Sequence, residues 1–82
     1  MNREEIVARI NAFLIDDFEV EADALQPEAS LKEALELDSL DYIDLVVAIE
    51  QAFHFKVKTE DFQTMLTMND FYNYVEARLM AA

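Results

Sequence analysis

Eighty-two residues suffice for one compact domain, residues 1–82, but not for two separate hydrophobic cores. Hydrophobic residues make up 54% of the chain and cysteine is absent, so a core is expected while disulfides and thiolate metal sites are excluded. Eighteen acids against six bases give a formal charge of −12, which disfavours binding to nucleic acid or anionic lipid and favours either a basic protein partner or a purely solubilising role.

The first predicted element is a helix over residues 3–16. Asn2 followed by Glu5 fits a helix start, and an apolar stripe with helical spacing runs from Ile6 to Leu14 until acids end it. The acidic start of the chain and its short aliphatic runs, the longest being Leu45–Ile49, fit neither a signal peptide nor a membrane span. We therefore expect a cytoplasmic protein that does not insert into membranes.

A long connection follows, over residues 18–37. Its length exceeds that of an ordinary loop, so we expect it to pack across the helices through scattered apolar anchors, with one short helical turn at residues 30–34. These anchors are Phe18, Val20, Leu25, Leu31 and Leu35.

The next helix is predicted over residues 39–53, with Asp38 as its N-cap and Asp41 at the third helical position. At about 100° per residue, its apolar side chains fall into two clusters on opposite faces. The larger cluster, which we assign to the core, is Tyr42, Leu45, Val46, Ile49 and Phe53. The smaller is Leu40, Ile43 and Val47, flanked by acids. That strip either forms a docking surface or is covered by the third helix or the long connection.

The remaining elements complete an all-α architecture, since the chain has no glycine and one proline and so little material for tight hairpins. Residues 55–58 are expected to be an extended loop, and residues 59–62 begin a short helix. Thr67 and Asp70 form a predicted capping box for a last helix whose buried face is Phe71, Tyr74, Val75 and Leu79. This gives three longer helices, one short helix and a long first loop.

Ser39, one of two serines, stands at the predicted start of the second long helix. Asp38 has the better claim to the capping position, so the hydroxyl of Ser39 is expected to be free. His54, the only histidine, lies at the far end of the same helix, ~22 Å away, so a catalytic serine–histidine pair is excluded. No calcium loop fits either, because that motif needs a glycine and none exists. An exposed hydroxyl at a helix N-terminus can accept a phosphate ester, although the neighbouring acids oppose it.

These residues resemble the acyl carrier protein family. Asp38-Ser39-Leu40 matches its Asp-Ser-Leu attachment motif, and residues 41–50 follow the order of acids and apolar residues in its second helix. Counterparts elsewhere are Ala29-Ser30-Leu31, Phe53, Thr67-Met68 and Tyr74-Val75, so the similarity covers nearly the whole chain.

The resemblance implies a four-helix bundle that is not an enzyme and contains no catalytic or metal site of its own. It implies that Ser39 receives 4′-phosphopantetheine from coenzyme A, through a separate phosphopantetheinyl transferase, and that the arm's thiol carries acyl groups as thioesters. The docking residues would be Asp38, Leu40, Asp41, Ile43, Asp44, Val47 and Glu50. Partners would be basic surfaces of acyl-processing enzymes such as synthases, reductases and acyltransferases in fatty acid, polyketide or related biosynthesis, bound by a monomeric carrier.

One position departs from the family pattern. The family usually has glycine two residues before the aspartate, where this chain has Glu36, so the backbone there is expected to differ locally. Two other functions stay open: an aminoacyl or peptidyl carrier with the same arm, and an unmodified acidic helical adaptor that binds a basic partner.

Overall fold

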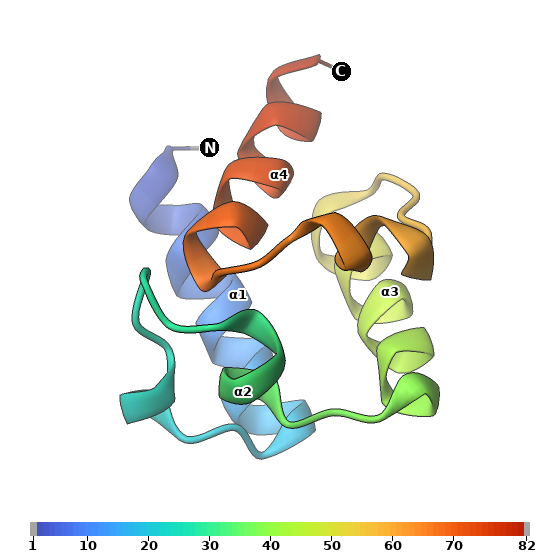
Figure 1. The fold of residues 1–82 in the computed structure, drawn as a ribbon. Helices are drawn as coiled ribbons and strands as arrows, with labels where there is room; N and C mark the ends of the chain where they lie inside the picture. The colour runs from blue at the N-terminus through green and yellow to red at the C-terminus, as the bar shows by residue number, and fades with distance from the viewer. Residues whose placement is uncertain (1, 82) are drawn as a thin grey trace.

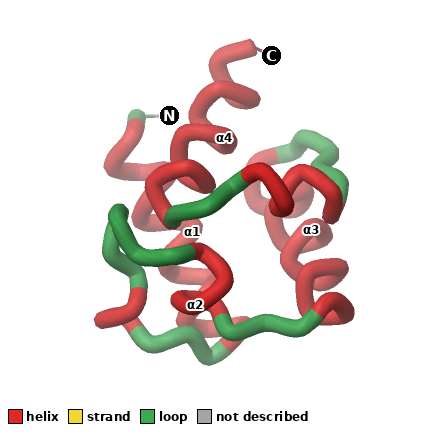
Figure 2. Tube along the Cα trace, viewed as in Figure 1, coloured by secondary structure: helices red, strands yellow, loops and turns green. Residues whose placement is uncertain are grey.

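The computed structural model describes residues 2–81, which form helices joined by irregular segments (Figures 1 and 2). The elements are α1 (Arg3–Phe18), the 3-10 turn η1 (Ala22–Ala24), α2 (Leu31–Leu35), α3 (Ser39–Phe53), the 3-10 turn η2 (Thr59–Thr64) and α4 (Met68–Ala81). Among these residues there is no strand, only an isolated antiparallel bridge between Ser30 and Thr67. The all-α prediction with three longer helices is confirmed; the short helix expected from Thr59 is the 3-10 turn η2, and the turn expected at residues 30–34 is α2.

The helix ends follow the predicted caps. The Asn2 side chain accepts a hydrogen bond from the Glu5 N–H at 2.9 Å. At α4, the Thr67 hydroxyl accepts from the Asp70 N–H, and the Asp70 carboxylate accepts from the Thr67 N–H, both at 3.2 Å. α1 ends at Phe18 and not at Asp16 as predicted, because Phe18 packs against the core and so extends the apolar stripe by one further residue.

Three helices supply most of the core. The buried residues of α1 are Ile6, Ile10 and Leu14, those of α3 are Leu45, Ile49 and Phe53, and α4 contributes Phe71, Tyr72 and Val75. Tyr72 was not predicted to be buried, and its hydroxyl donates a hydrogen bond of 2.6 Å to Asn11 of α1. α1 and α4 therefore pack along each other through both apolar and polar contacts, as Figure 1 shows.

The long connection between α1 and α3 packs as predicted. Val20, Leu25, Leu31 and Leu35 are buried. Its backbone also pairs with the segment before α4, through the bonds Leu31 N–H to Leu66 C=O at 2.9 Å, Met68 N–H to Ala29 C=O at 3.0 Å and Asn69 N–H to Pro27 C=O at 2.9 Å. These bonds fix α2 beside the start of α4.

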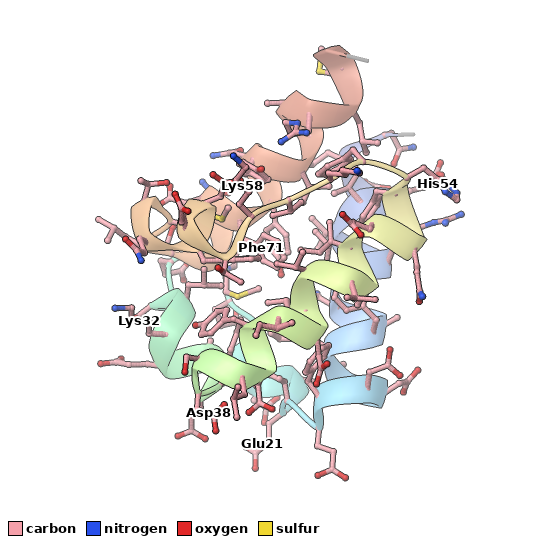
Figure 3. The ribbon with its side chains drawn as sticks, turned by 90° about the vertical axis from the view of Figure 1, so that its right-hand side faces the viewer. Glu21, Lys32, Asp38, His54, Lys58 and Phe71 are labelled. Carbon is pink, nitrogen blue, oxygen red and sulfur yellow. The ribbon has the colours of Figure 1, made fainter. Side chains whose placement is uncertain are left out.

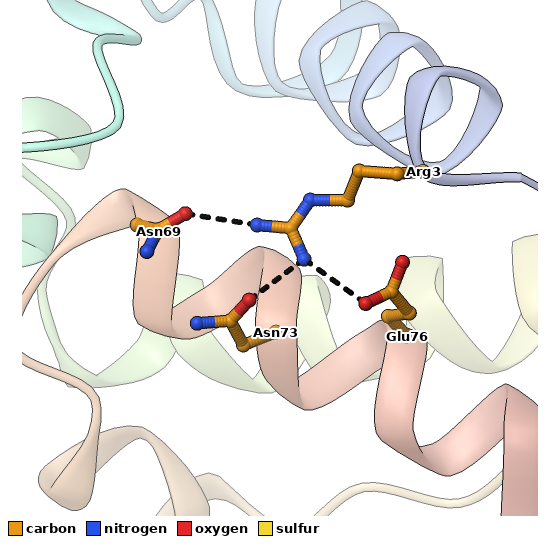
Figure 4. Close-up of polar contacts among 4 residues, drawn as sticks. All are labelled: Arg3, Asn69, Asn73 and Glu76. Carbon is orange, nitrogen blue, oxygen red and sulfur yellow. Dashed lines mark hydrogen bonds and ion pairs between the residues drawn. The ribbon is translucent and has the colours of Figure 1, made fainter.

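A polar clamp joins the beginning of α1 to α4 (Figure 4). The Arg3 guanidinium donates to Asn73 at 2.7 Å and to Asn69 at 2.8 Å, and it meets the Glu76 carboxylate at 3.4 Å. It also lies 5.7 Å from the centre of the Tyr72 ring. One arginine thus bridges two turns of α4. Within residues 2–81, no helix has the length and apolar character needed to cross a membrane.

Candidate functional site

The start of α3 leaves the Ser39 hydroxyl free. Asp38 is the N-cap, and its carboxylate accepts hydrogen bonds from the N–H groups of Leu40 and Asp41, both at 3.0 Å. Ser39 follows as the first helical residue; its side chain is exposed and enters no hydrogen bond within residues 2–81. The aspartate therefore takes the capping role that the serine would otherwise fill, as the sequence predicted.

The other serine is used differently. Ser30 is the N-cap of α2, with its hydroxyl 3.5 Å from the N–H of Glu33, and it is half-buried. Ser39 is consequently the more exposed of the two serines.

The turn before the site has an unusual backbone. Glu36 is the C-cap that follows α2, and its φ of 49° and ψ of 39° place it in the left-handed region. Its N–H donates to the Lys32 carbonyl at 3.0 Å. A residue with a side chain pays for this conformation, whereas glycine does not. Glu36 therefore adopts, with a side chain, a conformation that suits glycine.

No histidine stands beside Ser39, and the neighbouring Asp38 carboxylate is engaged in capping the helix. His54 follows the last residue of α3, so the 15-residue helix separates it from Ser39, and Figure 3 shows Asp38 and His54 at opposite ends of that helix. No group of three or more potential metal-ligating side chains occurs in the part of the chain that the structure describes. Ser39 therefore has an exposed hydroxyl with no histidine beside it.

The apolar strip of α3 is exposed, which settles the alternative that the sequence left open. The exposed fractions are 72% for Leu40, 53% for Ile43 and 45% for Val47. On the opposite face, Leu45, Ile49 and Phe53 are buried, while Tyr42 and Val46 pack against the core from its edge. Neither η2 nor the long connection covers the strip.

Two grooves of different character flank this strip. The acidic groove, of about 450 Å³, lies between the end of α1 and α3 and contains Asp17, Glu19, Asp41 and Asp44 over the apolar side chains of Phe18 and Val47. The Lys32 groove, of about 490 Å³, lies between α2, α3 and η2, and contains Lys32, Ser39, Tyr42, Ile43, Phe62 and Gln63. Ser39 belongs to the Lys32 groove, whose lining includes no carboxylate.

Aromatic rings close the floor of the Lys32 groove. Tyr42 and Phe62 have ring centroids 5.4 Å apart, and Phe62 meets Phe71 edge to face at 5.6 Å. Burial raises the pKa of the Tyr42 hydroxyl. These contacts hold η2 against α3 and α4, with Phe71 in the interior of the fold (Figure 3).

A polar network fixes η2 from the other side. The Tyr74 hydroxyl donates to the Asp61 carboxylate at 2.8 Å, and the same carboxylate accepts from the Lys58 N–H at 3.2 Å. Arg78 donates to the Tyr74 hydroxyl and to the Lys56 carbonyl, both at 2.9 Å. The hydrogen bond from Tyr74, followed by that from Lys58, holds the pKa of Asp61 below its ordinary value. Burial, and then the bond to Asp61, raises the pKa of Tyr74.

Sequence reasoning missed this network and the Lys32 groove. Both are assembled from segments far apart in the chain, so no local spacing marked them. The one available signal was Lys32 itself, a cation within the predicted helical turn at residues 30–34 in an otherwise acidic region.

Comparison with known proteins gives a match to one family and relatives of similar length. Residues 8–75 match the family described as "Phosphopantetheine attachment site". A protein of Thermosynechococcus vestitus named "Acyl carrier protein" is 31% identical over 81 residues, which cover 99% of this chain and 100% of that protein. Another so named, from Rubrobacter xylanophilus, is 36% identical over 75 residues, 92% of this chain and 93% of that protein.

Proposed function

This chain belongs to the phosphopantetheine-attachment family as an acyl carrier protein, and from that premise we propose that Ser39 is the residue to which its 4′-phosphopantetheine is attached. Proteins of this family are carriers and not enzymes, and their covalent arm provides a terminal thiol that holds acyl groups as thioesters. The observation that carries the assignment is the contrast between the two serines. Ser30 caps a helix, whereas the Ser39 hydroxyl is exposed and free.

The surroundings of Ser39 fit an attached phosphopantetheine. Its hydroxyl opens into the Lys32 groove, which offers apolar side chains, an amide from Gln63 and one cation, matching an arm with a phosphate, amide groups and an alkyl chain. Since His54 lies at the far end of α3 and Asp38 is engaged as the helix cap, a separate phosphopantetheinyl transferase would remove the hydroxyl proton and deliver the arm from coenzyme A.

The proposed docking surface is the exposed strip of α3 with its acids. Apolar contact with Leu40, Ile43 and Val47 would provide affinity, since these side chains remain open to solvent. The carboxylates would attract and orient basic surfaces of the transferase and of acyl-processing enzymes; they are Asp38, Asp41, Asp44 and Glu50. Ser39 lies at one end of this strip, so a docked partner would meet the arm directly.

The proposed role is to present acyl intermediates of fatty acid, polyketide or related biosynthesis to synthases, reductases or acyltransferases in the cytoplasm, as one carrier domain. Tethering raises the effective concentration of the intermediate at each partner's active site. The relatives named above favour an acyl load over an aminoacyl or peptidyl one.

The test is modification of the purified protein with coenzyme A and a transferase of broad specificity, followed by intact-mass measurement. We expect the wild type to gain the mass of one phosphopantetheine, Ser39→Ala to gain none, and Ser30→Ala, the matched control, to gain one. Circular dichroism would establish that both variants are helical, since Ser30→Ala removes a cap worth about 1 kcal/mol. Modification of Ser39→Ala, or none of the wild type with several transferases, would refute the assignment and leave the unmodified adaptor.

A further inference from the structure

One cation stands where the rest of the site is acidic. The chain has six lysines and arginines, and of these only Lys32 lines either of the two grooves beside α3. Its side chain is exposed, and it forms no ion pair within residues 2–81. Figure 3 shows Lys32 reaching outward from α2, in the region between η2 and the start of α3.

We propose that Lys32 is a positioning residue for the arm: its ammonium group pairs with the phosphodiester on Ser39 and directs the pantetheine into the Lys32 groove, along α3 toward η2. This inference rests on the proposed function, because it requires an arm on Ser39. It adds which of the two grooves the arm occupies and which side chain decides it.

The charges on the two sides of α3 support this direction. A phosphodiester is an anion at neutral pH, and the acidic groove presents Asp17, Glu19, Asp41 and Asp44 to it. The Lys32 groove presents no carboxylate and one ammonium group. An arm that can turn either way from Ser39 is therefore repelled on one side and attracted on the other.

The helix start cannot replace Lys32 in this role. The N–H groups of Leu40 and Asp41, which would otherwise be free to bind a phosphate, already donate to the Asp38 carboxylate. That carboxylate also adds a negative charge next to Ser39. The capped helix start therefore offers little attraction for the phosphodiester, and Lys32 is the cation that shares a groove with Ser39.

Beyond the phosphate, the groove suits the remainder of the arm. Ile43 and the rings of Tyr42 and Phe62 offer an apolar wall to its alkyl segments, while Gln63 and Thr59 offer polar groups to its amides. The paired rings close the floor, so the arm lies along the surface.

The experiment uses the modified protein with a nitroxide spin label on the arm's thiol and measures the broadening of backbone amide signals by NMR. Thr59 and Gln63 report on the Lys32 groove, and Asp17 and Gln51 report on the acidic groove. The variants are Lys32→Gln, Lys32→Glu and the matched control Lys56→Gln, which removes the same charge from an exposed lysine beyond the far end of α3.

We expect the wild type and Lys56→Gln to show broadening concentrated at Thr59 and Gln63. In Lys32→Gln that broadening should fall by up to about fivefold, the size of an exposed ion pair, and Lys32→Glu should shift it toward Asp17 and Gln51. Salt at 1 M should weaken the effect more in the wild type than in Lys32→Gln, which keeps only the repulsion from the acidic groove.

Three results would overturn the inference: wild-type broadening centred on the acidic groove, an unchanged pattern in Lys32→Gln, or an equal loss in Lys56→Gln. All three require that the arm is attached, so they leave the proposed function standing. Absence of modification at Ser39 is a different result, and it would remove the proposed function together with this inference.

Discussion

Glu36→Gly should stabilise the fold. Glu36 adopts φ 49° and ψ 39° because α2 must end there and the chain must turn into α3. Its side chain is exposed and makes no hydrogen bond in the described chain, so substitution removes no side-chain bond. The chain contains no glycine, and a non-glycine residue occupies each of the three left-handed positions among residues 2–81.

The expected gain follows from two opposing terms. A residue with a Cβ loses about 1–2 kcal/mol in the left-handed region, which glycine avoids. Glycine also lowers the free energy of unfolding by about 0.4–1 kcal/mol, because it makes the unfolded chain more flexible. The net gain in the free energy of unfolding is about 0.5–1 kcal/mol, which for a domain of this size raises Tm by roughly 2–8 °C.

Urea and thermal unfolding followed by circular dichroism would measure this gain. Glu36→Ala removes the same carboxylate while keeping the Cβ, so it should not be stabilised. Glu21→Gly makes the same substitution at φ −72°, where glycine only adds flexibility, and should lower stability by about 0.5–1 kcal/mol. Equal stabilities of Glu36→Gly and Glu36→Ala would show that the left-handed backbone carries no penalty, and the reasoning would be wrong.

Two further predictions concern the polar contacts that fix α4. Tyr74→Phe should cost about 1–2 kcal/mol at pH 7, because it removes a hydrogen bond to the Asp61 carboxylate. Since the folded-state pKa of Asp61 is lowered, this contribution to stability is full above the ordinary carboxyl pKa of ~3.9 and is lost as pH falls through the lowered value. Urea unfolding should therefore show a smaller difference between Tyr74→Phe and wild type near pH 2 than at pH 7. An equal difference at the two pH values would contradict the assignment. Arg3→Leu should cost about 1 kcal/mol through loss of its three polar contacts to α4. Arg9→Leu, on the exposed face of the same helix, should change stability by less than about 0.5 kcal/mol; equal effects in chemical unfolding would argue against the clamp.

The local features of α3 could be predicted from sequence because each depends on residues close in the chain. A capping aspartate is recognised from its place before an apolar periodic segment, and the two faces follow from the helical repeat. What covers a face depends on distant segments, so the exposure of Leu40, Ile43 and Val47 could be decided only in three dimensions.

Long-range contacts account for the features that sequence reasoning missed. Tyr72 is buried, and its hydroxyl donates a hydrogen bond to Asn11, 61 positions earlier; no spacing within α4 indicates that partner. The short helix predicted from Thr59 is a 3-10 turn, Thr59–Thr64. At its start, the Asp61 carboxylate accepts a hydrogen bond from the Lys58 N–H. The Lys32 groove needs α2, α3 and η2 together.

Asp38 precedes Ser39 in an order that keeps the serine hydroxyl free, in contrast to Ser30. Serine and aspartate are both strong helix caps, so a serine that directly precedes a helix uses its hydroxyl on the backbone, as Ser30 does toward Glu33. Placing an aspartate one position earlier satisfies the same orphan N–H groups with a carboxylate and moves the serine inside the helix. The aspartate therefore adds a negative charge beside the position of the proposed phosphate, but it leaves the Ser39 hydroxyl without a competing backbone partner. A cation close by, but outside the acidic strip, would offset that charge without weakening the attraction of basic partners, and Lys32 occupies such a position.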